Sequence, residues 1–466
     1  IMGVAVAVGA GIFSIGAQAA AFHAGPAVVL SFLIAGVVCG AAVMCYAEFA
    51  SMIPVAGSAY TFTYTTVGEI VAWVIGWDLI FEMLMAGSVV SKYWGVYLNQ
   101  FFELIGWNIN TNIAIGSFNF DLAPVIIVAF FTALLVMGTK IGARVDGALT
   151  ILKIAIVVFI VVVGFFYIKA ENFTPFIPPS EPAASTDGSG VSAVMEQPLW
   201  QWATGMAPSI YGVTGIISGA ALVFFAFLGF DVVATASEET INPKKNVPLG
   251  IGVGLGLIIV LYTLVAIVTT GMVSYKDLAK QSDPSLAVAF KMVGADWAAK
   301  IISLGIVIGM ATVVMVLLLG LTRVVFAMSR DGLLPRGLSH TGKHGTPVRL
   351  QIIVGVVMAL IAACCNVGIL SDMVNIGTLS AFTLVAISIP IMRKKRPDLE
   401  RSFKIPGNPW VPILIAIANL WLMVNLSVLT WIRFVVWLIV GFAIYFGYGY
   451  RHARLGAGEL EVAAQE

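Results

Sequence analysis

Residues 218–248, SGAALVFFAFLGFDVVATASEETINPKKNVP, decide the fold of this chain. The stretch is apolar enough to cross a bilayer, yet Gly229 lies between two apolar runs and Asp231 follows two residues later. Glycine lets the backbone leave helical geometry, and unpaired peptide groups at that depth are costly unless they line a cavity or meet a ligand. The alternative is a glycine for close helix packing with an aspartate bonded to a neighbouring helix. The stretch therefore predicts either a broken membrane helix with a ligand site or a tightly packed one.

Composition places the chain among polytopic membrane proteins. Hydrophobic residues make up 60% of the 466 residues, charged residues make up 11%, and the mean hydropathy is +1.00. This is too much apolar surface for a soluble fold of one or two domains. Apolar runs of about 17–25 residues predict an all-α fold with twelve transmembrane helices. They are expected near 1–19, 26–47, 67–97, 123–138, 147–168, 214–237, 248–272, 298–327, 349–365, 373–392, 410–429 and 431–450.

The basic residues indicate how the chain is oriented. Lysine and arginine gather in alternate connections, most densely in 393–404, which predicts that both termini are cytoplasmic and that the protein lies in the cell membrane. The net charge of +1 says nothing about nucleic acid, because the charges are distributed by side of the membrane rather than gathered in a patch, and no nucleic-acid partner is expected. The four cysteines lie in or at the ends of spans, so no disulfide framework is expected. Because Ile1 already lies inside a span, we expect a cytoplasmic segment to precede it.

The first expected span carries a second interruption. Gly9, Ala10 and Gly11 form a small-residue cluster, which either permits tight helix contact or allows unwinding that frees N–H groups for a carboxylate. The first and sixth spans cross the bilayer in opposite directions, and interrupted helices at matching positions of two inverted halves indicate a transporter site at the midplane. Helix N-termini there favour an anionic group and C-terminal carbonyls a cationic one, which suits a zwitterion such as an amino acid.

Four further residues carry charge that a simple membrane anchor does not need. Asp78 and Glu82 are spaced i, i+4 and share one helix face that must look into the bundle; we favour Glu82 as functional and Asp78 as a helix contact. Lys153 lies about 9 Å along the fifth span, where it either snorkels or carries a proton. Glu48 precedes a short connection rich in proline and glycine, which is either an inner gate or a simple turn.

Several motifs together resemble one transporter superfamily. The chain is similar to the amino acid–polyamine–organocation superfamily, most closely the cationic amino acid transporter family and its bacterial homologues, from Ile1 to about Arg451. The motifs are GAGIF, YAEFASMIPVAGSAYTF, WDLIFE, Lys153, FFAFLGFDVVATASEETINP and LTRVVFAMSRDGLLP. The resemblance implies a five-plus-five inverted-repeat core with broken helices 1 and 6. The parts are two repeats (1–168 and 214–392), an extracytoplasmic loop (169–213), a basic cytoplasmic loop (393–409), peripheral helices (410–450) and a cytoplasmic tail (451–466).

The same resemblance implies a substrate site. The substrate carboxylate would meet backbone around Ala7, Ala10 and Gly11, and its ammonium would meet carbonyls near Phe225, Ala226 and Leu228, with Phe225 as an aromatic lid. Glu82 matches an acid close to the substrate side chain, and Lys153 matches the lysine that stands where related transporters bind sodium. Glu48 and Asp231 are expected in gating or structural roles.

The expected function is secondary active, proton-coupled uptake of a small neutral or cationic L-amino acid by alternating access. Ala10 stands where some relatives carry a hydroxyl, and the stretch 313–319 is apolar, so alanine fits better than arginine. The open alternatives are an obligate exchanger or sodium symporter on the same fold and a non-transporting amino-acid sensor. An enzyme is the least expected reading, because the histidines are assigned to loops or the tail and no GxSxG motif is present. We expect no cofactor or metal. The expected partners are an amino acid, protons and the lipid bilayer, and a single-span accessory protein is compatible with the sequence.

Overall fold

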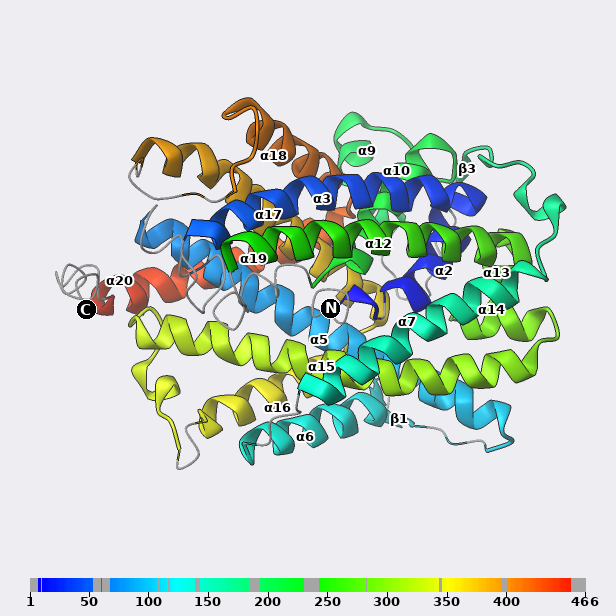
Figure 1. The fold of residues 1–466 in the computed structure, drawn as a ribbon, viewed down its shortest axis with the longest axis horizontal. Coiled ribbons are helices and arrows are strands. Elements are labelled where there is room, and N and C mark those ends of the chain that lie inside the picture. The colour runs from blue at the N-terminus through cyan, green and yellow to red at the C-terminus, as the bar shows by residue number, and fades with distance from the viewer. Residues whose placement is uncertain are drawn as a thin grey trace.

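The protein is described here from a computed structural model. It describes residues 7–9, 11–52, 60, 68–107, 109, 111–115, 118–138, 143–183, 193–229, 243–281, 283–342, 346–395, 397, 401 and 403–453. Within these ranges the chain is mostly helical, with two small two-stranded sheets (Figure 1).

The helical elements follow one another along the whole chain. In order they are η1 (Gly11–Ile15), α2 (Gly16–Ala19), η2 (Ala20–Ala24), η3 (Gly25–Ala27), α3 (Val28–Met52), α5 (Glu69–Leu104), α6 (Leu122–Val136), α7 (Ala143–Phe165), η4 (Ala170–Phe173), α8 (Ala193–Glu196), α9 (Leu199–Thr204), α10 (Gly212–Val223), η5 (Phe224–Phe227), α12 (Pro243–Met272), α13 (Tyr275–Leu278), α14 (Leu286–Met292), α15 (Asp296–Arg330), η7 (Arg336–Ser339), α16 (Val348–Cys364), α17 (Val367–Lys395), α18 (Trp410–Met423), α19 (Val428–Ile444), η8 (Tyr445–Gly449) and α20 (Tyr450–His452).

The strands form two short hairpin-like pairings. Strands β1 (Asn112–Ile115) and β2 (Phe118–Asp121) pair antiparallel between α5 and α6, and β3 (Glu181–Pro182) pairs with β4 (Ser209–Ile210). Asp121 ends β2 and caps α6, because its carboxylate accepts a hydrogen bond from the Ala123 N–H at 3.2 Å.

Seven helical stretches are long and apolar enough to cross a membrane, as judged over the described residues. They are Gly11–Glu48, Glu69–Leu104, Gly147–Phe165, Gly252–Met272, Asp296–Arg330, Val367–Lys395 and Val428–His452; shorter apolar helices lie at Leu122–Val136, Gly212–Phe227, Val348–Cys364 and Trp410–Met423. Each of these stretches overlaps one or two expected spans. The helices are longer than the apolar runs at several ends: α5, for example, continues to Leu104 rather than ending near residue 97.

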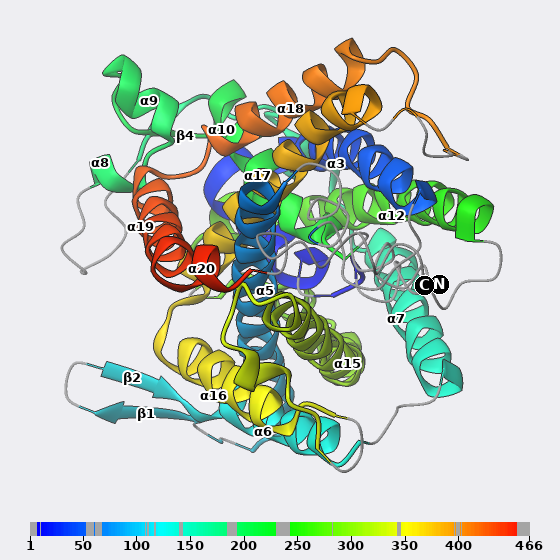
Figure 2. The same cartoon turned by 90° about the vertical axis from the view of Figure 1, so that its left-hand side faces the viewer.

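The long helices pack in two groups around the middle of the molecule. Helices α5 and α15 lie along one another and, with α6 and α16, make up the first group (Figure 2). Helix α3 packs against α10 and α12 in the second group, and α17 contacts α5, α18 and α3. One continuous cluster of buried hydrophobic side chains runs through both groups.

The sequence-based assignment of His23 to a loop is wrong. The first helical stretch continues past Ala19, so His23 lies in η2, and its Nδ1 is 3.2 Å from the Ser218 hydroxyl of α10. The helix turns only at Gly25, whose φ of +60° favours glycine, and Pro26 follows. The small residues before Gly25 are compatible with a helix, so the helix continues as far as Ala24.

Candidate functional site

The first membrane stretch is interrupted where its glycines predict. Ala7 is helical, Val8 and Gly9 are not, and helix resumes at Gly11 as the π-helical segment η1; Ala10 lies outside the described residues. Two tyrosines from other helices meet carbonyls on either side of the interruption. The Tyr262 hydroxyl donates to the Ala7 carbonyl at 2.5 Å, and the Tyr97 hydroxyl donates to the Phe13 carbonyl at 2.6 Å.

The sixth expected span is also broken. Helix α10 ends at Val223, η5 continues as a tighter 3-10 turn, and Leu228 is extended with ψ of 149°. Gly229 then takes a φ of +109°, a conformation that side chains rarely adopt. Asp231 lies outside the described residues. The glycine at position 229 therefore sits where the backbone leaves the helix.

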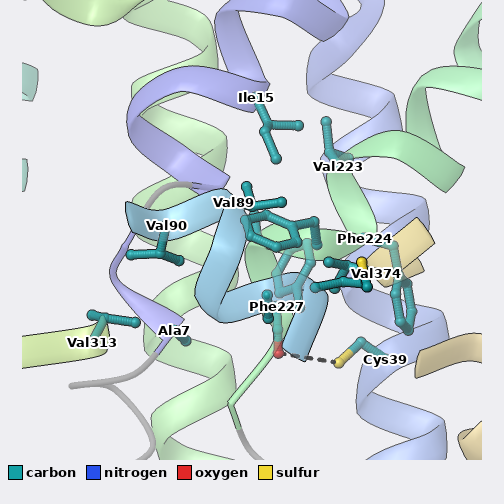
Figure 3. Packing of buried hydrophobic residues seen from close by; sticks show 14 of the residues in the cluster. Ala7, Ile15, Cys39, Val89, Val90, Val223, Phe224, Phe227, Val313 and Val374 are labelled. Atoms are coloured by element: carbon teal, nitrogen blue, oxygen red, sulfur yellow. Dashed lines mark hydrogen bonds between the residues drawn. The ribbon is translucent and has the colours of Figure 1, made fainter. Parts of the chain in front are cut away.

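Side chains also meet carbonyls at this second break. The Asn375 side-chain nitrogen donates to the Leu222 carbonyl at 3.0 Å, and the Cys39 thiol lies 3.8 Å from the Phe227 carbonyl (Figure 3). Unpaired carbonyls are costly in an apolar interior, so these donors stabilise a backbone that has lost its helical partners.

The two breaks touch each other. A Cβ at Gly11 would overlap the Cα of Ala226, so the glycine brings the backbones of η1 and η5 into contact. Ala7, Phe225 and Ala226 are all buried, and Leu228 is half-buried. The structure thus brings Gly11 of the predicted carboxylate set against Ala226 of the predicted ammonium set. Valines surround this region, among them Val89, Val90 and Val313 (Figure 3).

The two broken helices are also joined at their ends away from the breaks. The Tyr211 hydroxyl donates to the Ala21 carbonyl at 2.6 Å, and the Tyr211 N–H donates to the His23 carbonyl at 2.9 Å. Burial raises the pKa of Tyr211, which lies just before α10, to about 12, so its hydroxyl stays protonated and keeps donating. Ser31 adds a bond from α3 to the Ile216 carbonyl at 2.7 Å.

The charged residues predicted within spans are buried. Glu82 is 2% exposed, and Asp78 lies against α17, because a Cβ at Gly377 would be 3.6 Å from its Oδ1. Lys153 is also 2% exposed; its stem packs on Gly309 of α15, where a Cβ would lie 3.0 Å from the lysine Cγ. Full burial argues against the snorkelling alternative for Lys153, since a snorkelling lysine places its ammonium in water.

Glu48 is the centre of a buried ionic cluster. Its two carboxylate oxygens accept hydrogen bonds from Nε and Nη2 of Arg393 at 2.8 and 2.5 Å, and Oε2 also accepts from the Ile405 N–H at 2.8 Å. Arg393 in turn donates to the Ile405 carbonyl at 2.9 Å, and Nε of Arg401 lies 3.8 Å from Oε1. The end of α3 is thereby tied to the end of α17 and the segment after it.

Sequence reasoning missed the residues that hold the breaks and the ionic cluster. Tyr97, Tyr262 and Asn375 are lone polar groups in apolar helices, a signal that marks a buried hydrogen bond without naming its partner. Arg393 and Arg401 belong to a basic stretch that sequence alone assigns to solvent. Within the described ranges no group of three or more His, Cys, Asp and Glu side chains is placed to hold a metal ion.

Comparison with known proteins identifies the family. A family model described as amino acid permease matches residues 1–446. The chain is 40% identical over 463 residues to the methylthioribose transporter of Bacillus subtilis (strain 168), covering 98% of this chain and 93% of that protein. It is 40% identical over 465 residues to the branched-chain amino acid permease BcaP of the same organism, with 98% and 92% covered. It is 36% identical over 404 residues to the vacuolar cationic amino acid transporter 2 of Arabidopsis thaliana, with 85% and 59% covered. Together with its membrane-spanning helices, these matches make it a multi-pass membrane protein that belongs to the amino acid permease family of the amino acid–polyamine–organocation superfamily.

Proposed function

We propose that this chain takes up a small neutral L-amino acid together with a proton, by alternating access across the cell membrane. The observation that carries the proposal is the meeting of two broken helices at Gly11 and Ala226 inside a buried core. A zwitterion suits this place, because interrupted helices offer N–H groups to a carboxylate and carbonyls to an ammonium.

The proposed architecture is the five-plus-five inverted repeat with twelve spans and both termini in the cytoplasm. The first repeat covers 1–168, the second covers 214–392, and the spans within 410–450 are peripheral. The long stretch Gly11–Glu48 overlaps the first two expected spans, which supports counting it as two spans in the proposed twelve. The basic cytoplasmic loop at 393–409 and the tail from 451 complete the proposed division, with the extracytoplasmic loop at 169–213.

In the proposed site, backbone at Ala7, Ala10 and Gly11 receives the substrate carboxylate. Carbonyls near Phe225, Ala226 and Leu228 receive the ammonium, and the Phe225 ring closes over the substrate. The Leu222 carbonyl already accepts from Asn375, and the Phe225 carbonyl accepts from the Leu228 N–H at 3.2 Å. The carbonyls of Ala226 and Leu228 are therefore the proposed main acceptors of the ammonium.

The substrate side chain is proposed to be aliphatic. Val89, Val90 and Val313 lie around the breaks (Figure 3). The acid Glu82 is buried on α5, seven residues before Val89. Two relatives are named as branched-chain amino acid permeases, one at 40% and one at 31% identity. A third is named as a transporter of methylthioribose, a sugar derivative without the paired charges that suit the breaks. These observations favour L-leucine or L-alanine over L-arginine and over methylthioribose.

Lys153 is proposed to carry the coupling proton. It is a buried cation packed against α15, and a fixed positive charge at this place disfavours sodium. Protonated Lys153 favours the outward-facing, substrate-binding state; loss of the proton to the cytoplasm weakens the site. Coupling follows because proton and substrate both favour the same state. Glu48 and its arginines, described above, are proposed to act at the inner gate.

The test is uptake into proteoliposomes. Radiolabelled L-leucine, L-alanine, L-arginine and methylthioribose are offered with and without an imposed proton gradient, using wild type, Lys153→Ala and the control Lys92→Ala. Lys92 is a second lysine in a membrane helix, but its ammonium donates to carbonyls at the end of α16, the closest that of Cys365 at 2.7 Å. We expect gradient-driven accumulation of neutral amino acid that Lys153→Ala abolishes and Lys92→Ala retains.

The other outcomes decide between the alternatives. Uptake that ignores the gradient but needs internal amino acid would make the protein an exchanger and Lys153 a structural charge. Saturable amino-acid binding without flux would make it a sensor. Uptake of methylthioribose alone would refute the proposed amino-acid substrate.

A further inference from the structure

Among the described residues, only the nitrogen of the buried Asn375 side-chain amide has a hydrogen-bond partner. Its side chain is 0% exposed, and its nitrogen donates to the Leu222 carbonyl at 3.0 Å, while its oxygen accepts no hydrogen bond from any described residue. A peptide carbonyl can only accept, so the amide nitrogen must face Leu222 and the orientation of the amide is settled. Asn375 therefore holds a buried acceptor oxygen in a defined position.

Asn375 is attached to the second break through its nitrogen. Leu222 is in the last turn of α10, directly before η5, and α17 also contacts η5. Val374, the neighbour of Asn375 in the chain, lies near the Phe224 ring (Figure 3). Asn375 is thus anchored one helical turn before Ala226, the residue at which the two breaks meet.

A buried acceptor without a donor is unfavourable and calls for a partner. The surroundings that the structure shows are apolar, from Val223 and Phe224 to Val374. An ammonium group brings three donors to this region. The Phe225 carbonyl is already bonded to the Leu228 N–H, so the carbonyls of Ala226 and Leu228 leave one donor for the Asn375 oxygen. The proposed substrate thus supplies the missing partner.

We propose that Asn375 is a substrate-binding residue whose side-chain oxygen accepts a hydrogen bond from the ammonium group of the bound amino acid. Its nitrogen at the same time holds the Leu222 carbonyl, so one amide joins α17 to both the broken helix and the substrate. The inference rests on the proposed amino-acid transport and adds a side-chain contact to a site otherwise made of backbone.

The chain offers a matched control in Asn419. This residue of α18 is also 0% exposed, and neither of its amide atoms has a partner among the described residues. Helix α18 contributes none of the proposed substrate contacts. Asn419→Leu therefore reports what the loss of a buried amide does to the protein in general.

The experiment measures L-leucine uptake and its inhibition by 4-methylpentanoate, which has the leucine carbon chain and carboxylate but no ammonium. We expect Asn375→Leu to raise the KM for L-leucine by about 10- to 100-fold, since a hydrogen bond to a charged group is lost. The inhibition constant of 4-methylpentanoate should not change. Asn375→Asp keeps an acceptor but loses the donor to the Leu222 carbonyl, so it should raise the KM less than Asn375→Leu does. Asn419→Leu should leave both constants unchanged.

Defined results overturn the inference. An unchanged KM in Asn375→Leu, or equal shifts for L-leucine and 4-methylpentanoate, would show that the oxygen does not contact the ammonium. If Asn375→Leu does not reach the membrane folded, Asn375→Ser gives the same comparison with a smaller change in packing. A wild type that transports no amino acid would instead defeat the proposed function, which these assays distinguish from a failure of Asn375 alone.

Discussion

At the scale of single residues, Gly11 shows why the first break needs glycine. A side chain at this position would collide with the Cα of Ala226, a backbone atom that cannot move unless η5 moves with it. The role of Gly11 is therefore to let two backbones touch, in addition to freeing N–H groups beside the break. Gly256 of α12 is different, since a Cβ there would meet nothing within 4 Å.

We expect Gly11→Ala to lower L-leucine uptake by at least about tenfold. A Cβ that overlaps the Cα of Ala226 forces η1 and η5 apart, which misplaces both halves of the proposed site. Uptake in proteoliposomes and the melting temperature of the purified protein check this. The control Gly256→Ala should transport normally and gain up to about 1 kcal/mol, since alanine suits an open helical position better than glycine. Normal KM in Gly11→Ala would contradict the close contact.

The residues that interrupt the helices were predictable from sequence, but those that stabilise the interruptions were not. Gly9 and Gly229 can be picked out from the sequence because Gly9 clusters with Ala10 and Gly11, and Gly229 lies two residues before the charged Asp231. The partners Tyr262 and Ala7 are 255 residues apart, and Asn375 and Leu222 are 153 apart. A single sequence carries no record of which distant helices meet, so it gives no way of pairing these groups.

At the scale of elements, one buried carboxylate fastens three parts of the chain. Glu48 ends the membrane part of α3, and its bidentate pairing with Arg393 and its bond to the Ile405 N–H tie α3 to α17 and to the segment after α17. Both the carboxylate and Arg401 are nearly inaccessible to water, with side chains 0% and 6% exposed. A fork of two hydrogen bonds fixes geometry as well as charge, which is what a gate that must close reproducibly requires.

Removing Glu48 should destabilise the protein strongly. Glu48→Ala leaves Arg393 and Arg401 without their shared counter-charge, and loss of one member of a buried pair costs about 3–5 kcal/mol. Arg393→Lys should cost less but should still lower the melting temperature, because lysine cannot form the fork.

Melting of the detergent-solubilised protein tests both changes. The control is Glu103→Ala, which breaks the half-exposed pair of Glu103 with Lys291 at 2.8 Å and should cost under about 1 kcal/mol. Equal melting temperatures for Glu48→Ala and Glu103→Ala would mean that the cluster around Glu48 is as well solvated as a surface pair.

At the scale of the whole molecule, the order of helices was predictable and their grouping was not. Apolar runs indicate where helices lie, because each must satisfy its own backbone in lipid. Which helices pack together depends instead on shape at small residues: at Gly36 of α3 a Cβ would lie 2.8 Å from Ile259 of α12. Such fits are invisible in composition, so the group formed by α3, α10 and α12 appears only in the structure.

The proposed orientation can be tested with two single cysteines in a variant that lacks Cys39, Cys45, Cys364 and Cys365. Gly337→Cys lies in η7 between α15 and α16, and Ala203→Cys lies in α9; both positions are exposed. With both termini cytoplasmic, an impermeant maleimide added to intact cells should label Ala203→Cys and spare Gly337→Cys until the membrane is opened. The reverse pattern would invert the topology and place the basic connections outside.

The length of α5 has a mechanical consequence. Its 36 residues make a rod about 54 Å long, so a tilt of about 10° around its middle displaces each end by about 5 Å. Near its C-terminal end this rod carries Tyr97, bonded to the Phe13 carbonyl, and Tyr93, whose hydroxyl donates to Gln18 at 3.1 Å. Helix α5 is therefore attached, near one end, to the segment that follows the break in the first membrane stretch. Because α5 is long, a small tilt about its centre would move that attached segment by several ångströms.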